Sequence, residues 1–477
     1  MSITRRTSFQ AAPVQAVTSQ NYLDIQNNGW AQQYLPDLME KEAEVYGKRT
    51  ISGFLSQVGA EEAMSADQVI WSEQGRLHLS YECDMLDVTA STINITKDID
   101  GVAQTTTHGI RVGDQVLIAG GGQTVTARVS VAAAGNQTIT VQPYRFAHMT
   151  NAGFANGDNT CTILVFGSEN AKGVAYVGGR SNEPSFTTFT NKPIILKDMY
   201  EVSGSDAAQV GWVEVSGEEG QNGYYWYLKA EGDTRARFTD YLEMSMIESE
   251  LVAAASAIAL PTDGGAGTAG TEGLFAAIRS RGNQTSGVTG TNPSTDFAEF
   301  DLILAEFDRN GAIEENMMFV NRGTSLAMDD MLASLNSGYS GGTSYGVFNN
   351  SEDMALNLGF SGFRRGSYDF YKSDWKYLND LATRGGINNS ATAGEDIRGV
   401  VIPAGTSSVY DQQLGKNLKR PFLHVRYRAS QLESRKMKTW VTGSVGAATS
   451  DLDAMTVNFL SERCLITQGA NNFMLMN

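Results

Sequence analysis

Short glycine and serine patterns in the sequence match motifs that can carry chemistry. Residues 265–270 read Gly-Ala-Gly-Thr-Ala-Gly, which fits the G-x-G-x-x-G pattern of a dinucleotide site. Residues 338–342 and 342–346 both fit G-x-S-x-G, the pattern of a serine nucleophile elbow. The first would hold a pyrophosphate at a helix N-terminus, and the second would present a serine for acyl transfer.

The elements around these patterns argue against both chemistries. A dinucleotide site needs a preceding strand and an acidic residue about twenty positions later, whereas a helical segment precedes residue 265 and no such acid follows. The elbow also needs a preceding strand, but residues 328–339 look helical and His424 is the one downstream histidine. We therefore expect neither site to be real.

Residues that could bind a metal are scattered along the chain. The histidines and cysteines are His78, His108, His148, His424, Cys83, Cys161 and Cys464. Their spacing fits no metal site and no disulfide framework, and three unpaired cysteines fit synthesis in a reducing cytosol. The sequence thus predicts a protein that is not an enzyme and has no cofactor and no metal site.

Length and composition indicate a globular protein of two or three domains. The chain has 477 residues, of which 41% are hydrophobic and 19% are charged. Its net charge of −17 argues against a protein that grips nucleic acid phosphates. The first twenty residues lack the apolar core of a signal peptide, and no window of roughly 18 apolar residues predicts a membrane span.

The charges are distributed unevenly along the sequence. Residues 218–250 hold eight acidic and three basic side chains, a local net charge of −5, whereas residues 416–438 hold eight basic and one acidic, a net charge of +7. One interpretation is ordinary solvated surface, and the other is a pair of complementary surfaces that favour contact between copies of the chain. The candidate interface residues are Lys419, Arg420, Arg426, Arg428, Arg435, Lys436, Glu231, Asp233, Asp240 and Glu243.

The longest predicted element is a helix over residues 222–260. Most of its residues are good helix formers, and apolar side chains recur at the 3 or 4 residue spacing of one helix face. As one helix its 39 residues would extend about 58 Å. The charged segment around residues 231–237 excludes a coiled coil and a membrane span. A break at Gly232 stays open, because glycine weakens a helix interior.

The pattern of strands and helices expected in the rest of the sequence predicts an α+β fold. Residues 1–60 read as a polar arm with a short helix near 38–46, and residues 98–167 read as a small β-barrel or β-sandwich. A helix is expected to begin at the N-cap candidates Thr295 and Asp296 and to end at Gly311. Further elements are a strand at 317–321, a helix at 325–339, a strand near 400 and a polar, turn-rich tail.

The order of these parts resembles the major capsid proteins of tailed bacteriophages, which have the Hong Kong 97 type fold. The segments NKPIILKDMYEVSGSDAAQVGWVEV and YYWYLKAEGDTRARFTDYLEMSMIESE are similar to the strand and spine helix of that family's peripheral domain. LFAAIRSRGNQTSG and the ending TVNFLSERCLITQGANNFML are also similar, most of all to capsid proteins of crAss-like phages that infect gut bacteria. The resemblance rests on order and texture, because the family has no short diagnostic motif.

The resemblance implies a division of the chain. It comprises an N-terminal arm (1–60), an extended E-loop (61–97 and 168–190), an inserted β domain (98–167), a peripheral domain (191–275 and 411–477) and an axial domain (276–410).

The resemblance also implies a role in the virion. The chain would assemble with itself into hexamers and pentamers of an icosahedral shell, made in the host cytoplasm. Scaffold, portal and decoration proteins would be its partners, and it would enclose double-stranded DNA without reading its sequence and without a membrane. The alternative class is a tail-tube or other ring-forming virion protein, which would not need the long helix followed by an α/β domain.

Overall fold

The chain folds as α+β and divides into two compact units. The computed structural model describes residues 53–55, 60–104, 108–132, 135–158, 161–173, 186–205, 225–252, 270–311, 313–338, 362–388, 396–404, 406–411, 416–444 and 449–477. Residues 70–189 form one unit, here called the barrel unit. Residues 1–69 and 190–477 form the other, here called the larger unit.

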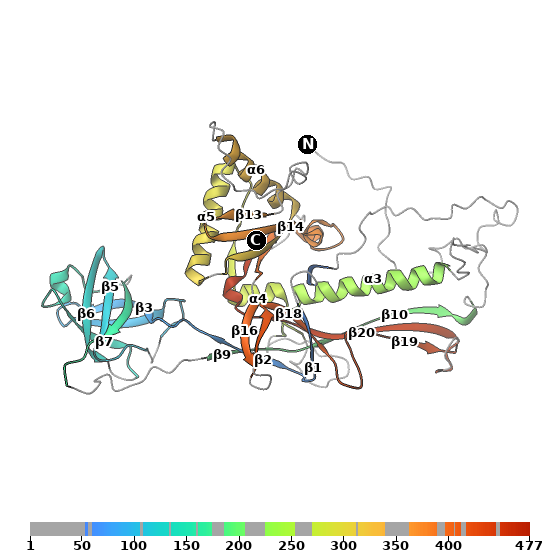
Figure 1. Cartoon of the computed structure of the whole chain (residues 1–477), viewed down its shortest axis with the longest axis horizontal. Coiled ribbons are helices and arrows are strands. Elements are labelled where there is room, and N and C mark those ends of the chain that lie inside the picture. Colours follow the sequence, from blue (N-terminus) through green and yellow to red (C-terminus); the bar gives the residue numbers. More distant parts are fainter. Residues whose placement is uncertain are drawn as a thin grey trace. The chain divides into compact units, whose positions relative to one another are not determined.

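The barrel unit contains a closed six-stranded barrel (Figure 1). Its strands are β3 (Ser80–Asp87), β4 (Thr92–Asp98), β5 (Asp114–Gly120), β6 (Gln123–Ala132), β7 (Thr138–Pro143) and β8 (Cys161–Ser168), with the short 3-10 helix η1 (Met149–Ala152). They follow one another around the barrel in the order β3-β4-β7-β6-β5-β8, and β8 pairs again with β3. A closed barrel has no unpaired edge.

Alternation of apolar and polar residues explains the barrel. Ile93, Ile118 and Ile139 are fully buried and point to a common interior, because successive residues of a strand face opposite sides. The predicted β domain began at residue 98, but the barrel begins at Ser80. The reason is that β3 and β4, assigned from sequence to an extended loop, complete the ring. The second pair in this region is β2 (Val69–Gln74) with β9 (Phe186–Asn191).

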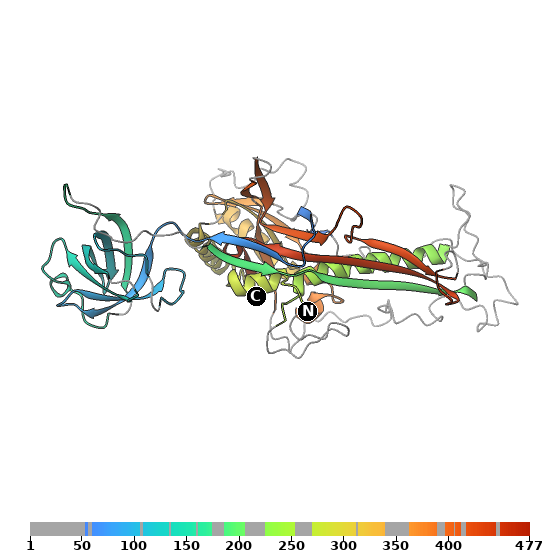
Figure 2. The same ribbon diagram turned by 90° about the horizontal axis from the view of Figure 1, so that it is seen from below.

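The larger unit contains a five-stranded sheet built around one long strand. The strands are β1 (Ala60–Met64), β10 (Ile194–Ser203), β18 (Leu423–Arg428), β19 (Lys438–Gly443) and β20 (Ala454–Thr467). Their order is β1-β18-β20-β10, with β19 also paired to β20. Only β1 and β18 run parallel among these pairs. Figure 2 shows β10 and β20 running side by side.

The tail of the chain is buried, which corrects the prediction of a polar, turn-rich ending. Most residues of β20 are buried on both of its faces, and the last strand, β21 (Met474–Met476), is buried as well. The short 3-10 helix η2 (Ala470–Asn472) joins them. The prediction was wrong because Ser461, Glu462 and Arg463 interrupt the apolar run and resemble a turn. Each of them has a polar partner inside the fold.

The long helix, α3, spans Tyr225–Glu248 and lies along β10 and β20 (Figures 1 and 2). Its 24 residues extend about 36 Å, so the predicted end near residue 260 was too late. It runs through Gly232 as one helix, which settles the question of a break there. Phe238 and Leu242 pack on Val457 and Phe459 of β20.

The end of α3 is fixed by the chain that returns to it. The N–H of Gly273 donates to the carbonyl of Ser249 at 2.8 Å. A side chain at Gly273 would lie 2.7 Å from that same oxygen, so only a glycine allows this approach. The next helix, α4 (Leu274–Arg281), starts at this contact.

A six-stranded mixed sheet forms the second layer of the larger unit. Its order is β11-β21-β15-β12-β14-β13. The strands other than β21 are β11 (Asn283–Thr285), β12 (Glu315–Val320), β13 (Gly362–Arg365), β14 (Tyr368–Asp374) and β15 (Gly399–Pro403). The associated helices are α5 (Pro293–Asn310), α6 (Arg322–Gly338), α7 (Lys376–Asn379) and α8 (Arg384–Asn388). A separate hairpin joins β16 (Thr406–Asp411) to β17 (Lys416–Pro421).

Two cores lie on the two faces of this sheet. Met318 and Val401 pack with α5 and α6. Their strand neighbours Phe319 and Val400 pack instead with α4 and with residues of the five-stranded sheet. The period-2 alternation of β12 and β15 therefore joins the two sheets through one shared core.

The caps of α5 were predicted in part. Gly311 ends the helix in the left-handed conformation with φ 65°, as expected. The N-cap is Asn292, however, whose side chain accepts from the N–H of Thr295 at 2.9 Å, followed by Pro293 at the first helical position. Asp296 is buried and accepts from the N–H of Gly290 at 2.9 Å.

Gly232 offers a direct test of the helix. No atom lies within 4 Å of a Cβ placed at this position, so Gly232→Ala should stabilise the chain by about 0.5–1 kcal/mol through helix propensity alone. Gly273→Ala is the matched control and should cost about 1–3 kcal/mol by overpacking. Calorimetric melting of both variants checks this, and a stabilised Gly273→Ala would contradict the close approach.

Candidate functional site

The acidic residues of α3 do not share one environment. Glu231, Asp233 and Asp240 are half-buried. Glu243 is 6% exposed and lies inside the larger unit. Arg237, on the same helix, pairs with Asp198 of β10 at 3.2 Å. The local charge of −5 in the sequence is therefore divided between the surface and the interior.

Glu243 holds the segment at residues 53–55. The backbone N–H of Leu55 donates to Oε1 at 2.8 Å, and that of Gly53 donates to Oε2 at 2.9 Å. Burial raises the pKa of the Glu243 carboxyl above its ordinary value, and the backbone hydrogen bonds oppose this shift only in part. The carboxylate thus serves as an internal acceptor for a segment distant in sequence.

Aromatic packing completes the attachment of this segment. The ring of Phe54 stacks on that of Trp375 with centroids 4.4 Å apart and meets Phe319 edge-on at 4.7 Å. Phe54 and Leu55 are both buried in the core shared by the two sheets. Residues 1–52, including the predicted short helix, lie outside the described residues.

In the basic segment, residues 416–438, the described basic side chains from Arg426 onward pair with acids of the same chain. Arg426 lies 3.2 Å from Glu62. Lys436 pairs with Glu61, and its ammonium lies 5.5 Å from the ring centroid of Tyr427. The acids come from β1, which β18 places alongside the arginines by parallel pairing. Parallel register therefore explains why Glu61 and Glu62 meet this segment.

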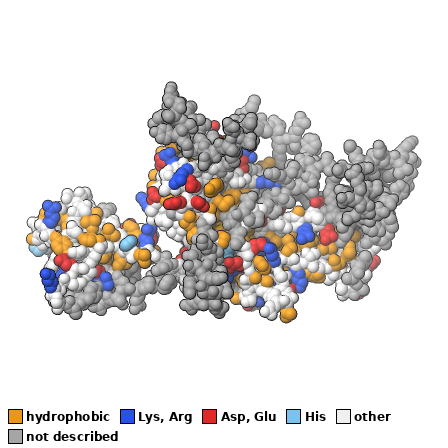
Figure 3. Space-filling model, viewed as in Figure 1, with side chains coloured by type: hydrophobic (Ala, Val, Ile, Leu, Met, Phe, Trp, Pro, Cys, Tyr) orange, Lys and Arg blue, Asp and Glu red, His pale blue; other side chains and the backbone are white. Residues whose placement is uncertain are grey.

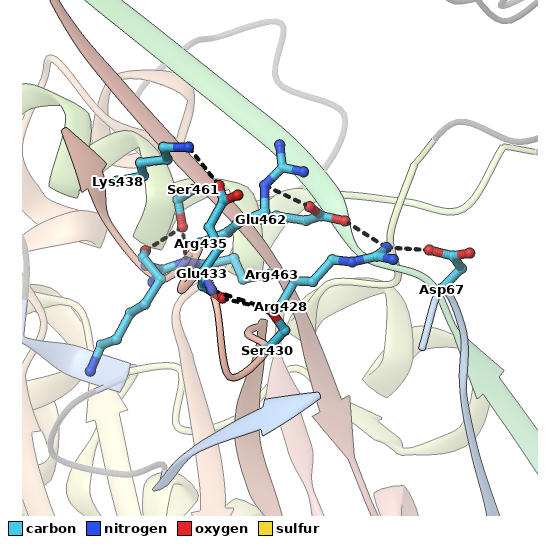
Figure 4. A network of polar contacts seen from close by, with 10 residues as sticks. Asp67, Arg428, Ser430, Glu433, Arg435, Lys438, Ser461, Glu462 and Arg463 are labelled. Carbon is cyan, nitrogen blue, oxygen red and sulfur yellow. Dashed lines mark hydrogen bonds and ion pairs between the residues drawn. The ribbon is translucent and has the colours of Figure 1, made fainter. Parts of the chain in front are cut away.

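Glu462 of β20 is the centre of the network in Figure 4. It is 4% exposed and lies 3.3 Å from Nη1 of Arg428 and 3.1 Å from Nε of Arg435. Arg428 also pairs with Asp67. A buried carboxylate is tolerated only when it is paired, so these two arginines are part of the fold of the larger unit.

Arg463 of β20 contacts the basic segment beside this network. Its Nε donates to Ser461 at 2.9 Å, and its Nη2 donates to the carbonyl of Lys436 at 2.9 Å. Burial lowers the pKa of the Arg463 guanidinium, and the nearby carboxylates of Glu61 and Glu243 oppose that shift. The contacts of Arg463 thus hold β20 to the backbone of the basic segment at Lys436.

The structure brings together part of the predicted set. Arg426, Arg428, Arg435 and Lys436 all pair with acids of β1 or β20, whereas Lys419 and Arg420 lie in β17. The carboxylate partners at residues 61–67 and at Glu462 were not predicted, because strand pairing between separate segments creates those contacts. In the face shown by Figure 3, acidic and basic side chains lie interspersed rather than in separate fields. Contact with a neighbouring copy stays a prediction.

The glycine and serine motifs considered at the outset fall almost wholly on residues that the structure does not describe. Residues 265–269 and 339–346 lie outside the described residues. His424 is fully buried, with its Nδ1 3.3 Å from the carbonyl of Pro421. Within the described ranges, no group of three or more His, Cys, Asp or Glu could hold a metal ion. Among the helices of those ranges, none has both the length and the apolar character needed to cross a membrane.

Comparisons with known proteins give weak similarities to phage structures. No family model and no curated protein matches the chain. It is similar to the capsid structure of the cyanophage P-SCSP1u, with 9% identity, TM-score 0.41 and 93% of each chain covered. It is also similar to the mature capsid of bacteriophage PhiM1, with 8% identity, TM-score 0.40 and coverage of 92% of this chain and 91% of that one.

The network around Glu462 predicts the effect of removing Arg428. Arg428→Ala would leave Glu462 buried with Arg435 alone and should destabilise the larger unit by about 1–2 kcal/mol, since the arginine side chain is 33% exposed. Arg309→Ala, at an exposed pair with Glu306, should cost under about 0.5 kcal/mol. Equal melting temperatures for the two variants would show that the network contributes nothing.

The raised pKa of Glu243 predicts a pH-dependent stability. The folded chain holds this proton more tightly than the unfolded chain, so the contribution is complete below about pH 4.3 and is lost as pH rises through the raised value. The melting temperature of the wild type should therefore fall relative to that of Glu243→Gln as pH increases from about 4.

Glu433 provides a control of opposite sign. A hydrogen bond from Lys438 holds the pKa of Glu433 below its usual value. Relative to Glu433→Gln, the wild type should gain stability as pH rises through the acidic range. The same slope for both pairs of proteins would refute the environment assigned to Glu243.

Proposed function

We propose that this chain is a major capsid protein of a tailed bacteriophage with the Hong Kong 97 type fold. It would self-assemble into hexamers and pentamers of an icosahedral head shell around double-stranded DNA. The observation that carries the proposal is α3 lying along the long strands β10 and β20, with a separate mixed sheet joined through one core. This is the arrangement that the sequence resemblance implies for a spine helix on a peripheral domain beside an axial domain.

The parts of the larger unit fit this assignment. Residues 191–275 and 411–477 would be the peripheral domain, containing β10, α3 and β18 to β20. Residues 276–410 would be the axial domain, completed by β21 from the tail. The pair of β2 and β9 would be the base of the E-loop, and the barrel would be an addition carried by that loop. We base the relationship to crAss-like phages on the resemblance of the quoted sequence segments to their capsid proteins.

The negative net charge suits a shell that encloses DNA. A net charge of −17 keeps a shell from adhering to the packed phosphates. In this proposal the chain is a structural protein that catalyses no reaction and binds no cofactor. Scaffold, portal and decoration proteins would be its partners in the virion, with assembly in the host cytoplasm.

The structure changes which residues are suitable for an interface test. Charge reversal at Arg426 or Arg428 would disturb carboxylates of the same chain, so a loss of assembly would be ambiguous. Lys419 and Arg420 lie in β17, which pairs with β16 in a hairpin outside both sheets. Substitution in this hairpin leaves the ion pairs of Arg426 and Arg428 in place, so we choose it for the interface test.

Electron microscopy of the purified full chain, alone and co-expressed with a scaffold, tests the function. Polyhedral shells are expected, tubes would indicate a tail-tube protein, and discrete particles under both conditions would refute a shell. The double variant Lys419→Glu with Arg420→Glu should abolish shells and keep the wild-type melting temperature. Arg309→Glu, at an exposed position, should assemble normally.

A further inference from the structure

Two cysteines that are far apart in sequence face each other in the barrel. Cys83 of β3 and Cys161 of β8 are direct partners in the antiparallel register. Each is 1% exposed, and both belong to the same barrel core. Directly opposed residues point to the same face of a sheet, so both thiols lie on the interior side.

The spacing of such a pair is compatible with a disulfide. Opposed Cα atoms in antiparallel strands lie about 4.5–5.5 Å apart, inside the range of about 4.4–6.8 Å found for disulfides. The Cβ atoms need to approach slightly, since disulfides favour a Cβ separation of about 3.8 Å. The register of β3 with β4 shifts between Glu82 and Cys83, where Thr96 of β4 is the extra residue, so the ladder beside this pair is already irregular.

The present side-chain arrangement leaves both thiols reduced. Sγ of Cys161 lies 3.7 Å from the carbonyl of Asp158, in the space that Gly120 leaves by lacking a side chain. To form a disulfide, this sulfur must leave the Asp158 carbonyl and reach the sulfur of Cys83. The Cys161 thiol would exchange one weak hydrogen bond for a covalent bond.

We propose that Cys83 and Cys161 form a latent disulfide that closes the seam between the first and last strands of the barrel. The inference rests on the barrel alone and is independent of the proposed function. A low-molecular-weight disulfide such as oxidised glutathione is the oxidant. One protein thiolate attacks it and releases one glutathione, and the second protein thiolate then displaces the other glutathione. Two protein thiols are oxidised, one glutathione disulfide is reduced, and the two protons pass to the released thiolates.

The surroundings predict when the bond forms. Burial raises the pKa of the Cys83 thiol to about 12, with Cys161 contributing, and burial also raises the pKa of Cys161. Protonated, enclosed thiols react slowly, so the bond should form as the barrel folds or opens. Once formed, it is enclosed and resists small reductants.

The test uses the full chain with Cys464→Ser, which leaves only the two barrel thiols. The protein is refolded in reduced and oxidised glutathione, digested without reductant and analysed by mass spectrometry. We expect a linked peptide joining Cys83 to Cys161 and loss of both titratable thiols. The barrel transition should melt roughly 5–15 °C higher than in the reduced protein, and dithiothreitol added under denaturing conditions should reverse this.

Cys83→Ser in the same background is the matched control. It should keep one thiol or carry one glutathione, and oxidation should not raise its melting temperature. A parallel oxidation of already folded protein in mild denaturant covers the case in which oxidative refolding fails. The proposal is overturned by glutathione adducts on both cysteines without a linked peptide, by two thiols that survive both treatments, or by a linked product that melts lower than the reduced form.

Discussion

The packing of β20 between other elements is the constraint on which the larger unit depends. β10 pairs with one edge of this strand, β18 and β19 pair with the other, and α3 packs on one face. Most of its residues are buried, so a shift of one residue would exchange its two faces and misplace every contact. The same segment continues into β21, the strand that borders β15 in the six-stranded sheet. One stretch near the end of the sequence therefore holds both sheets together.

Charged residues inside this strand add specificity to the apolar packing. Glu462 would be costly to bury alone, and only the correct register brings it to Arg428 and Arg435. Glu243 acts in a similar way on α3, because its carboxylate accepts two backbone N–H groups from residues 53–55. Both carboxylates select one arrangement of distant segments, and both read in the sequence as surface charge. Because these two carboxylates are buried, the net charge of a sequence segment is a poor guide to the charge on the surface.

Local patterns in the sequence were sufficient for most elements but not for their partners. The long helix, α6, the strand near residue 400 and the glycine cap at Gly311 follow from periodicity and capping chemistry. The end of α3 did not, because the return of Gly273 to Ser249 determines it. The first barrel strands were taken for a loop, since closure of the ring is a non-local property. β20 was missed because a strand buried on both faces lacks alternation, and its polar residues resembled those of a turn. The basic candidates are close together in sequence, yet three of the acids that pair with them, Glu61, Glu62 and Asp67, lie hundreds of positions away.

The pairing of the barrel's first and last strands bears on how the barrel could be exchanged or lost during evolution. The chain leaves the larger unit at residue 69 and returns at residue 190, and β3 with β8 and β2 with β9 keep the two connections adjacent. A folded piece whose ends lie together can be exchanged for another without altering the path of the chain outside it. The barrel is thus a replaceable cassette, and a lineage could vary or lose it while retaining the sheets, helix and core of the larger unit.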